Sequence, residues 1–241
     1  MDRYGLIGRN IAYSFSRNHF AEKFKKKDID AEYVNFDCND IEQVKKLLEG
    51  DDCLGYNVTI PYKEAIMPFL QEMNKHAQSI GAVNTIKRLQ DGRLKGYNTD
   101  YLGFRKALKP MLDKTHRKAL ILGTGGSSKA VAYALELEDI YYTYVSRNPD
   151  KEQLGYNQLN AAELSRYTVL INCTPLGTHP NVDQAPPLPY HLLGPEHLLF
   201  DLVYNPEKTK FMKAGAQRGA VVSNGFKMLQ LQAEAAWDIW N

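Results

Sequence analysis

Two polar segments carry the side chains best suited to chemistry. Lys63 ends a run that begins at Asn57, and Asp100 ends a run that begins at Gly96. A lysine beside a substrate hydroxyl or carbonyl can transfer a proton or stabilise negative charge that develops on oxygen. A carboxylate near that lysine can hold its ammonium group and bind a substrate hydroxyl. Lys63 and Asp100 are therefore candidates for a catalytic site, with a surface charge and a helix cap as the alternatives.

Smaller polar side chains lie near both candidates in the sequence. Asn57 and Thr59 come at the end of a predicted strand, and Asn84 lies in a short segment that begins with glycine. Amides and hydroxyls at such positions can orient a small polyhydroxylated acid. Ser14 and Ser16 follow the first predicted strand, where two hydroxyls can bind a carboxylate, although ordinary loop serines give the same pattern.

A glycine-rich turn follows the strand predicted over residues 118–122. The run Gly123-Thr124-Gly125-Gly126-Ser127-Ser128 places glycines where a strand turns sharply and phosphate oxygens approach backbone N–H groups at a helix start. The positive end of the helix favours the pyrophosphate. Ser128 replaces the third glycine of the usual dinucleotide motif, so the turn alone indicates either nucleotide binding or only a tight strand-to-helix connection.

Basic residues at the end of the next predicted strand favour NADP over NAD. An NAD site usually carries Asp or Glu there to hold the ribose hydroxyls. This chain has Ser146 and Arg147 instead, with Lys151 four residues after Arg147. A guanidinium offers a planar fork of donors that matches phosphate oxygens. We predict that Arg147 and Lys151 hold a 2′-phosphate, and the alternative is a pair of surface charges.

The composition argues against several other functions. Thirty basic and 28 acidic residues give a net charge of +2, which does not supply the positive field of a general nucleic-acid binder. No histidine pair has HExxH spacing and no serine lies in a G-x-S-x-G elbow, so we expect neither metal chemistry nor a covalent serine intermediate. No apolar stretch approaches the roughly 20 residues of a membrane span. Three cysteines without disulfide or metal spacing suit a reducing cytoplasm.

Two successive patterns of alternating strands and helices must position these groups. Strands are predicted over residues 3–7, 32–36 and 54–58, with helices near 18–27 and 40–48, which indicates a largely parallel sheet. A hairpin is predicted at Asp91-Gly92. A second alternating pattern begins after Asp100. Its helices are predicted to end near residues 112 and 135, and its strands are predicted over 118–122, 141–145, 169–172 and 198–203. The last amphipathic segment, residues 228–240, can pack back on the first domain.

We therefore predict an α/β protein of two domains. Residues 1–99 with 225–241 form a substrate-binding catalytic domain, and residues 100–224 form a Rossmann-like NADP-binding domain. Within the first domain, Asn39 or Asp40 is predicted to cap the second helix, with Gly50 just beyond its end. Lys63 is predicted to lie at the start of a further helix.

Taken in order, these motifs resemble those of the shikimate dehydrogenase family. The likeness runs from about Tyr4 to Trp240, and such agreement in order is specific. The opening loop departs from the family pattern, because it has Asn10, Tyr13 and Arg17 where the family usually has Pro, His and Pro. We expect Arg17 to point into solvent. The motifs that extend the likeness through the second domain are Asn172-Cys173-Thr174-Pro175-Leu176-Gly177, Asp201-Leu202-Val203-Tyr204-Asn205-Pro206 and Met228-Leu229 with Gln232.

The resemblance implies reversible, NADPH-dependent reduction of 3-dehydroshikimate to shikimate. Lys63 and Asp100 then form the catalytic pair that assists proton transfer. The residues it implies for substrate binding are Ser14, Ser16, Asn57, Thr59, Asn84, Asp100, Tyr204 and Gln232. The residues it implies for NADP are Gly123, Thr124, Gly125, Gly126, Ser127, Ser146, Arg147, Lys151 and Thr174.

Three alternatives stay open. The first is a quinate/shikimate dehydrogenase that uses NAD or both cofactors. The second is a non-catalytic sensor of shikimate or NADPH, which we expect to lack Lys63 or Asp100, yet both are present. The third, a different two-domain dehydrogenase, explains the upstream motifs poorly. In each case we expect a cytoplasmic monomer or homodimer that binds a small molecule and neither nucleic acid nor a membrane.

Overall fold

The protein divides into two compact units in the computed structural model, which describes residues 1–12, 14–50 and 52–241. Unit 1 comprises Met1–Thr99 and Ala233–Asn241, and unit 2 comprises Asp100–Gln232. The chain passes from unit 1 to unit 2 after Thr99 and returns at Ala233, inside the last helix. Tyr13 of the opening loop lies outside the described residues.

Unit 1 is built on a six-stranded sheet in which β1, β2 and β3 run parallel. β5 runs antiparallel to both of its neighbours, and the turn that joins it to β6 contains Gly92 at φ +85°. This is the predicted hairpin, and Gly92 supplies the left-handed conformation that the turn requires. In spatial order the strands are β2 (Ala31–Asp37), β1 (Asp2–Gly8), β3 (Gly55–Val58), β5 (Thr85–Arg88), β6 (Leu94–Tyr97) and β4 (Glu72–Met73).

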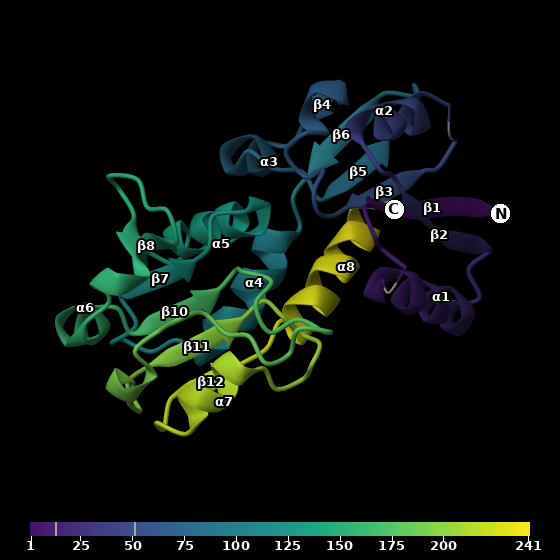
Figure 1. The fold of residues 1–241 in the computed structure, drawn as a ribbon. Helices are drawn as coiled ribbons and strands as arrows, with labels where there is room; N and C mark the ends of the chain where they lie inside the picture. Colours follow the sequence, from purple (N-terminus) through teal and green to yellow (C-terminus); the bar gives the residue numbers. More distant parts are fainter. Residues whose placement is uncertain (13, 51) are drawn as a thin grey trace. The chain divides into compact units, whose positions relative to one another are not determined.

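Helices cover both faces of this sheet (Figure 1). α1 (Phe15–Lys27) and the end of α8 (Phe226–Trp240) bury one face, and α2 (Ile41–Gly50) and α3 (Lys75–Ile80) bury the other. Trp240 stacks on Tyr4 at a centroid distance of 4.9 Å, and its Nε1 donates to the Ile86 carbonyl at 2.9 Å. A Cβ on Gly55 would lie 2.2 Å from that Nε1, so only glycine lets the indole approach this strand. Of the segment 228–240 that the sequence predicted to pack back, residues 233–240 lie on the first sheet, whereas residues 228–232 belong to unit 2.

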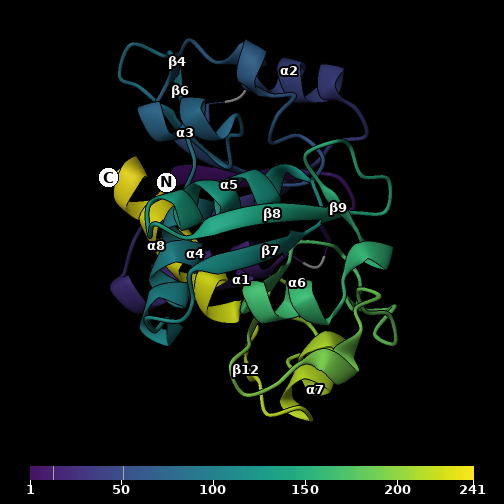
Figure 2. The ribbon, with the colours of Figure 1, turned by 90° about the vertical axis from the view of Figure 1, so that its left-hand side faces the viewer.

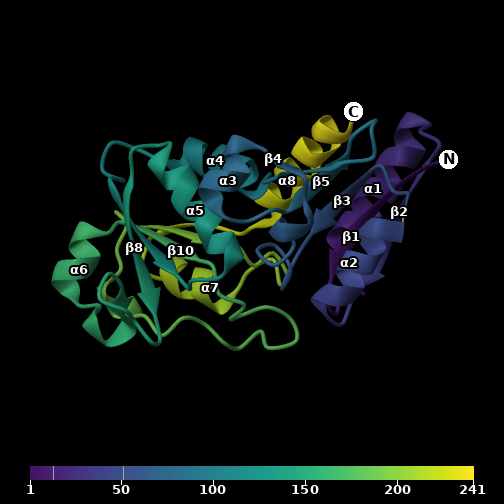
Figure 3. The ribbon, with the colours of Figure 1, turned by 90° about the horizontal axis from the view of Figure 1, so that it is seen from above.

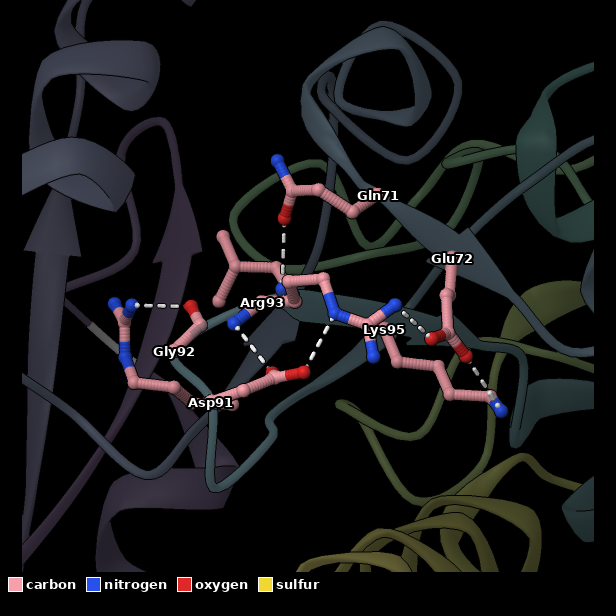
Figure 4. A network of polar contacts seen from close by, with 8 residues as sticks. Gln71, Glu72, Asp91, Gly92, Arg93 and Lys95 are labelled. Carbon is pink, nitrogen blue, oxygen red and sulfur yellow. Dashed lines mark hydrogen bonds and ion pairs between the residues drawn. The ribbon is translucent and has the colours of Figure 1, made fainter.

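Polar contacts fix the β5–β6 hairpin to the neighbouring strand β4 (Figure 4). Arg93 donates to Asp91 at 2.7 Å and to Glu72 at 2.5 Å, and Lys95 pairs with Glu72 at 3.0 Å. The backbone N–H of Leu94 donates to the Gln71 side chain at 2.8 Å. Hydrogen bonds from Lys95 and Arg93 hold the pKa of Glu72 below its ordinary value. These groups are partly or well exposed, so the network sets the register of the hairpin more than it stabilises the fold.

Unit 2 holds a second six-stranded sheet, and every strand pair in it is parallel. α4 (Asp100–Leu108) and α5 (Gly126–Glu136) cover one face, and α6 (Ala161–Arg166) and α7 (Lys210–Ala216) cover the other (Figures 2 and 3). In spatial order the strands are β12 (Val221–Ser223), β11 (Leu198–Asp201), β10 (Val169–Asn172), β7 (Lys118–Leu122), β8 (Tyr141–Ser146) and β9 (Leu154–Gly155). The short 3₁₀ helices of the two units are η1 (Met67–Phe69), η2 (Lys109–Met111), η3 (Tyr156–Gln158) and η4 (Tyr190–Leu192).

The central strands of unit 2 are apolar on both faces, as parallel strands covered by helices must be. Leu120 and Leu199 pack in the cluster that includes Phe211 of α7. On the opposite face, Phe104 of α4 meets Phe200 edge to face at 5.1 Å. Burial of side chains of this size contributes about 1.5–3 kcal/mol each, so the sheet is a rigid platform for the loops at its carboxyl edge.

The predicted fold class, a mainly parallel two-sheet α/β protein, is confirmed, but three local predictions need correction. Gly50 is the last residue of α2 rather than a residue beyond it, and Asp40 caps this helix by accepting from the Gln43 N–H at 2.8 Å. The strand predicted over 198–203 ends at Asp201. The residues from Lys63 form turns that lead into η1, rather than the start of an α-helix. Within the described ranges no helix has the length and apolar character needed to cross a membrane.

Candidate active site

The carboxyl edge of the first sheet gathers the predicted substrate residues of unit 1. β1 and β3 are parallel and end at this edge, and antiparallel β5 begins there. Residues that follow β1 and β3 or precede β5 must therefore lie at one edge, although the sequence separates them widely. The predicted residues placed there are Ser14, Asn57, Thr59 and Asn84.

A buried hydrogen-bond chain sets the orientation of Asn57. The Tyr33 hydroxyl donates to Asn57 Oδ1 at 2.8 Å, and Asn57 Nδ2 donates to Thr85 Oγ1 at 3.2 Å. Burial raises the pKa of the Tyr33 phenol, and a hydrogen bond with Ser16 partly offsets this effect. Tyr33 therefore stays a neutral donor at physiological pH, so the Asn57 amide is held in one orientation.

Asn84 connects β5 to the loop that precedes Asp100. Its Oδ1 accepts from the Thr99 N–H at 2.6 Å, and its Nδ2 donates to Thr99 Oγ1 at 3.0 Å. The Thr85 hydroxyl also donates to Asn84 Oδ1 at 3.1 Å. Asn84 is buried, so this two-point bond fixes the backbone immediately before Asp100. The residue thus has a clear structural role besides its predicted substrate contact.

Lys63 lies in a turn between two buried anchors. Tyr62 donates its hydroxyl to the Cys38 carbonyl at 2.6 Å, and Ile66 is fully buried. The Val83 N–H donates to the Lys63 carbonyl at 2.7 Å. The backbone of Lys63 is therefore fixed, while its side chain is half-buried. A lysine on a fixed backbone can place its ammonium beside a substrate oxygen, which suits proton transfer.

Ser14 and Ser16 flank the start of α1. Ser14 occupies the N-cap position, but its hydroxyl makes no cap hydrogen bond to this helix. Ser16 is buried in the first turn, whereas Arg17 is exposed, as expected. The first turn carries no acidic residue. The positive end of the helix dipole, with no acidic residue beside it, suits a carboxylate ligand.

Asp100 is the first residue of α4 and is buried. The N-terminal end of a helix favours a carboxylate there. One turn later, Gly103 allows α4 to approach α8, because a Cβ at this position would lie 2.6 Å from the Met228 carbonyl and 2.9 Å from the Gln232 Cβ. Unit 2 thus places Asp100 and the buried Gln232 on neighbouring helices. The pairing of Asp100 with Lys63 of unit 1 stays a prediction.

The glycine-rich turn has the form that a phosphate cradle requires. Gly123 adopts φ +101°, and a Cβ there would lie 2.9 Å from Thr174 Cγ2. A Cβ on Gly125 would meet no atom within 4 Å, so the space in front of the α5 N-terminus is open. Ser128 is buried and donates to the Gly125 carbonyl at 2.7 Å, which tightens the turn. These residues fit a pyrophosphate at the helix end, with Thr174 beside it.

Arg147 follows β8 at the same edge as the glycine turn. β7 and β8 pair Leu122 with Val145, and the Gly123 N–H donates to the Val145 carbonyl at 3.0 Å. Ser146 and Arg147 therefore come directly beside the turn. Arg147 and Lys151 are both exposed. A donor fork at this position fits a 2′-phosphate, while Lys151 lies in the following loop.

A buried polar network behind these loops was not recognised in the sequence. Asp201 Oδ1 accepts from Asn172 Nδ2 at 2.9 Å and from the Val203 N–H at 3.0 Å, and Oδ2 accepts from the Thr209 hydroxyl at 2.6 Å. Burial raises the pKa of Asp201 to about 6, against the effect of these hydrogen bonds. Tyr204, a predicted substrate residue, follows Val203 directly and is 36% exposed.

Two signals in the sequence could have revealed the missed residues. Asn172 and Asp201 are each the last residue of a buried apolar strand, where a polar side chain needs a partner. Tyr33 gave no such signal, because a tyrosine inside a strand usually packs in the core. Among the described residues, no group of three His, Cys, Asp or Glu side chains could hold a metal ion.

Known proteins resemble this chain over nearly its whole length. The family model for the shikimate dehydrogenase substrate binding domain matches residues 6–86. A shikimate dehydrogenase (NADP⁺) of Clostridium botulinum is 39% identical over 98% of this chain and 95% of its own length. A crystal structure of a shikimate dehydrogenase in complex with NADP⁺ has a TM-score of 0.92 and 34% identity, covering 100% of this chain and 90% of that one.

A second solved structure resembles this chain and holds both ligands. It is the shikimate 5-dehydrogenase of Thermus thermophilus in complex with NADP(H) and shikimate, with a TM-score of 0.89 and 30% identity. The match covers 100% of this chain and 94% of that one. The agreement in sequence and fold shows that the chain belongs to the shikimate dehydrogenase family.

Proposed function

We propose that this chain catalyses the reversible, NADP-dependent reduction of 3-dehydroshikimate to shikimate. The observation that carries the proposal is the similarity to NADP-dependent shikimate dehydrogenases along 98% of the chain. The open approach to the α5 N-terminus at Gly125, beside Arg147, supports it from the structure. NADPH, when bound, supplies the hydride that reduces the ring carbonyl carbon.

Unit 1 supplies groups that orient the substrate. We assign Ser14 and Ser16 to the substrate carboxylate, since both lie at the α1 N-terminus, which carries no acidic residue in its first turn. Asn57, Thr59 and Asn84 are assigned to the ring hydroxyls. The hydrogen bonds from Tyr33 and to Thr99 fix the two amides before substrate binds, which lowers the entropic cost of orientation.

Lys63 and Asp100 are assigned to proton transfer. In the reduction, the Lys63 ammonium gives a proton to the oxygen that was the ring carbonyl, and in the reverse direction the neutral amine accepts it. Asp100 is assigned to the hydroxyl at the reacting carbon, which it binds as a hydrogen-bond acceptor. Tyr204 and Gln232 complete the set of substrate contacts in this proposal.

Unit 2 supplies the residues for NADP. Gly123, Thr124, Gly125, Gly126 and Ser127 are assigned to the pyrophosphate, where backbone N–H groups and the helix dipole favour negative charge. Ser146, Arg147 and Lys151 are assigned to the 2′-phosphate, and Thr174 lies against Gly123 of the turn. Residues 1–99 with 225–241 are thus proposed as the substrate domain, and residues 100–224 as the cofactor domain.

Location and assembly also belong to the proposal. Cys38, Cys53 and Cys173 form no disulfide, which suits a reducing cytoplasm. We propose a monomer or homodimer that acts on a small molecule.

The test measures initial rates with the purified protein from the absorbance of the reduced nicotinamide. Shikimate or quinate is offered with NADP or NAD in all four combinations. We expect strong turnover with shikimate and NADP. Comparable rates with quinate or with NAD would replace the proposal with a dehydrogenase of broader specificity, and silence from folded protein in all four assays would favour a sensor.

A further inference from the structure

Two loops of unit 2 carry residues assigned to different ligands. Thr174 follows β10 and is assigned to the cofactor, and Tyr204 follows β11 and is assigned to the substrate. β10 and β11 are parallel neighbours, and Asn172 pairs with Asp201 at their carboxyl ends. The two loops therefore leave the sheet side by side, from a pair of polar residues that meet in the core.

The first arm of the network leads from Asp201 to the cofactor loop. Asp201 Oδ1 accepts from Asn172 Nδ2 at 2.9 Å. Asn172 Oδ1 then accepts from Thr174 twice, from the backbone N–H at 3.0 Å and from the hydroxyl at 2.6 Å. Thr174 lies against Gly123 of the phosphate turn, so these hydrogen bonds fix a residue that packs on that turn.

The second arm leads to the substrate loop. Asp201 Oδ1 also accepts from the Val203 N–H at 3.0 Å, directly before Tyr204. This bond bends the chain back at the end of β11, so the direction in which Tyr204 leaves the sheet depends on it. Both arms thus end on one oxygen of one carboxylate.

The third contact of the carboxylate has a different purpose. Asp201 Oδ2 accepts from the Thr209 hydroxyl at 2.6 Å, and Thr209 Oγ1 accepts from the Met212 N–H at the start of α7. This contact holds the far end of the loop and caps a helix, and it reaches neither assigned residue. It provides an internal control.

We infer that Asp201 is a positioning residue that sets Thr174 for the cofactor and Tyr204 for the substrate through separate hydrogen bonds. The inference rests on the proposed function. A fully buried carboxylate with three donors is costly to keep ionised, and the same loops could be anchored by an apolar core at lower cost. What the Asp201 carboxylate adds is the acceptor at Oδ1, because this one atom determines the relative placement of two ligand-binding loops.

Four variants separate positioning from simple stabilisation. Asp201→Ala breaks both arms, and we expect the dissociation constant for NADPH and the KM for shikimate each to rise by about tenfold. Asn172→Ala breaks only the cofactor arm, so the NADPH constant should rise while the KM for shikimate stays near its original value. Asp201→Asn is the conservative variant. Its amide oxygen can still accept from Asn172 Nδ2 and the Val203 N–H, and its NH₂ can donate to Thr209, so both constants should stay near their wild-type values.

Thr209→Val is the matched control, because it removes one hydrogen bond to the same carboxylate and touches neither arm. It should lower the melting temperature and leave both constants unchanged. NADPH binding is measured by fluorescence, independently of turnover, so an inactive wild-type protein would overturn the proposed function while the cofactor arm is still tested. Unchanged NADPH affinity in folded Asn172→Ala would overturn the inference even if Asp201→Ala does not fold. Equal effects of Thr209→Val and Asn172→Ala on NADPH affinity would do so as well.

Discussion

Lys63 occupies a turn whose backbone is anchored by its neighbours, so a change of its side chain should leave the fold intact. Lys63→Ala is expected to lower kcat by on the order of 10²–10⁴, because the proton would then have to come from water. Initial rates with shikimate and NADP measure this effect. Lys75→Ala, at an exposed position of α3, is the control and should turn over normally. A near-normal kcat for the Lys63 variant would remove this residue from the mechanism.

Arg147 is expected to determine the preference for NADP over NAD. Hydrogen bonds to a charged partner contribute about 1.5–3 kcal/mol, so Arg147→Ala should lower the ratio of kcat/KM for NADP to that for NAD by about 10- to 100-fold. Arg166→Ala changes another exposed arginine, on α6, and should leave the ratio unchanged. If the Arg147 variant lost activity equally with both cofactors, the 2′-phosphate would not be its ligand.

Asp201 is expected to make stability depend on pH. Its folded-state pKa of about 6 lies above the ordinary 3.8, so the folded protein keeps a proton that the unfolded chain loses between these values. Stability therefore falls as the pH rises from about 4 to about 6, by on the order of 3 kcal/mol at about 1.4 kcal/mol per pKa unit. The other titratable groups that face Asp201 are Cys173 and Tyr190, and burial raises the pKa of each, so both stay neutral in this range.

Urea unfolding of Asp201→Asn and the wild type at pH 4 to 7 isolates this effect, because the variant cannot titrate at this position. The wild type should lose stability relative to the variant as the pH rises toward 6, with no further change above it. A constant difference across the range would show that Asp201 titrates normally.

The sheet places two of the proposed substrate residues at one edge. Asn57 was predicted at the end of a strand and Asn84 in a short segment that begins with glycine, and strand pairing brings both to that edge. Their partners Tyr33 and Thr99 were not predicted, since they depend on strand register, which a single sequence does not fix. The helix expected after Lys63 is absent, because the chain forms turns over residues 63–66 and Pro68, in η1, cannot donate the backbone hydrogen bond that a continuing α-helix needs.

At the scale of elements, glycine substitutions in the connection from β7 to α5 test its proposed role in binding the pyrophosphate. Gly125 has φ −77° and open space around it, so Gly125→Ala should fold with a cost of at most about 1 kcal/mol at the N-cap. Its methyl group would project toward the proposed pyrophosphate, so NADPH affinity should fall at least tenfold by the loss of about 1.4 kcal/mol. Calorimetric unfolding and NADPH titration measure the two effects separately.

Gly123→Ala is the comparison, since φ +101° and the contact with Thr174 make alanine strained there. This variant should lose both stability and NADPH affinity. If Gly125→Ala bound NADPH normally, the turn would be a tight connection without a ligand.

Long periodic elements were predicted well, and the two-residue strands were not. β7 and the four-residue β10 have the predicted bounds, and α1, α2, α5 and α8 differ from prediction by a few residues at their ends. The two-residue strands β4 and β9 gave no signal, because strands of this length carry no alternation of polar and apolar residues. Their positions depend on pairing with β6 and β8.

For the molecule as a whole, residues 233–241 are expected to be essential to unit 1. Their removal takes Ala233, Ala236 and Trp240 from the cluster on one face of the sheet, and it also removes the partner of Lys23 and His19, Glu234. Loss of one large buried aromatic side chain alone costs about 3–5 kcal/mol. We expect unit 1 to lose amide protection in hydrogen exchange, while unit 2 still binds NADPH.

Removal of Asn241 alone is the control, because this residue is exposed. Full protection of β1 and β2 in the longer truncation would show that α8 does not stabilise this unit. Loss of NADPH binding would show that the two units do not fold independently.

The division of α8 between the units also has a consequence for biosynthesis. The ribosome releases β1, α1 and β2 before any part of unit 2, yet Trp240 emerges only after all of it. Tyr4, Phe20 and Phe24 therefore lack their contact with Trp240 on the nascent chain until the whole of unit 2 has been synthesised. This aromatic face is the part of the newborn protein that a ribosome-associated chaperone would meet.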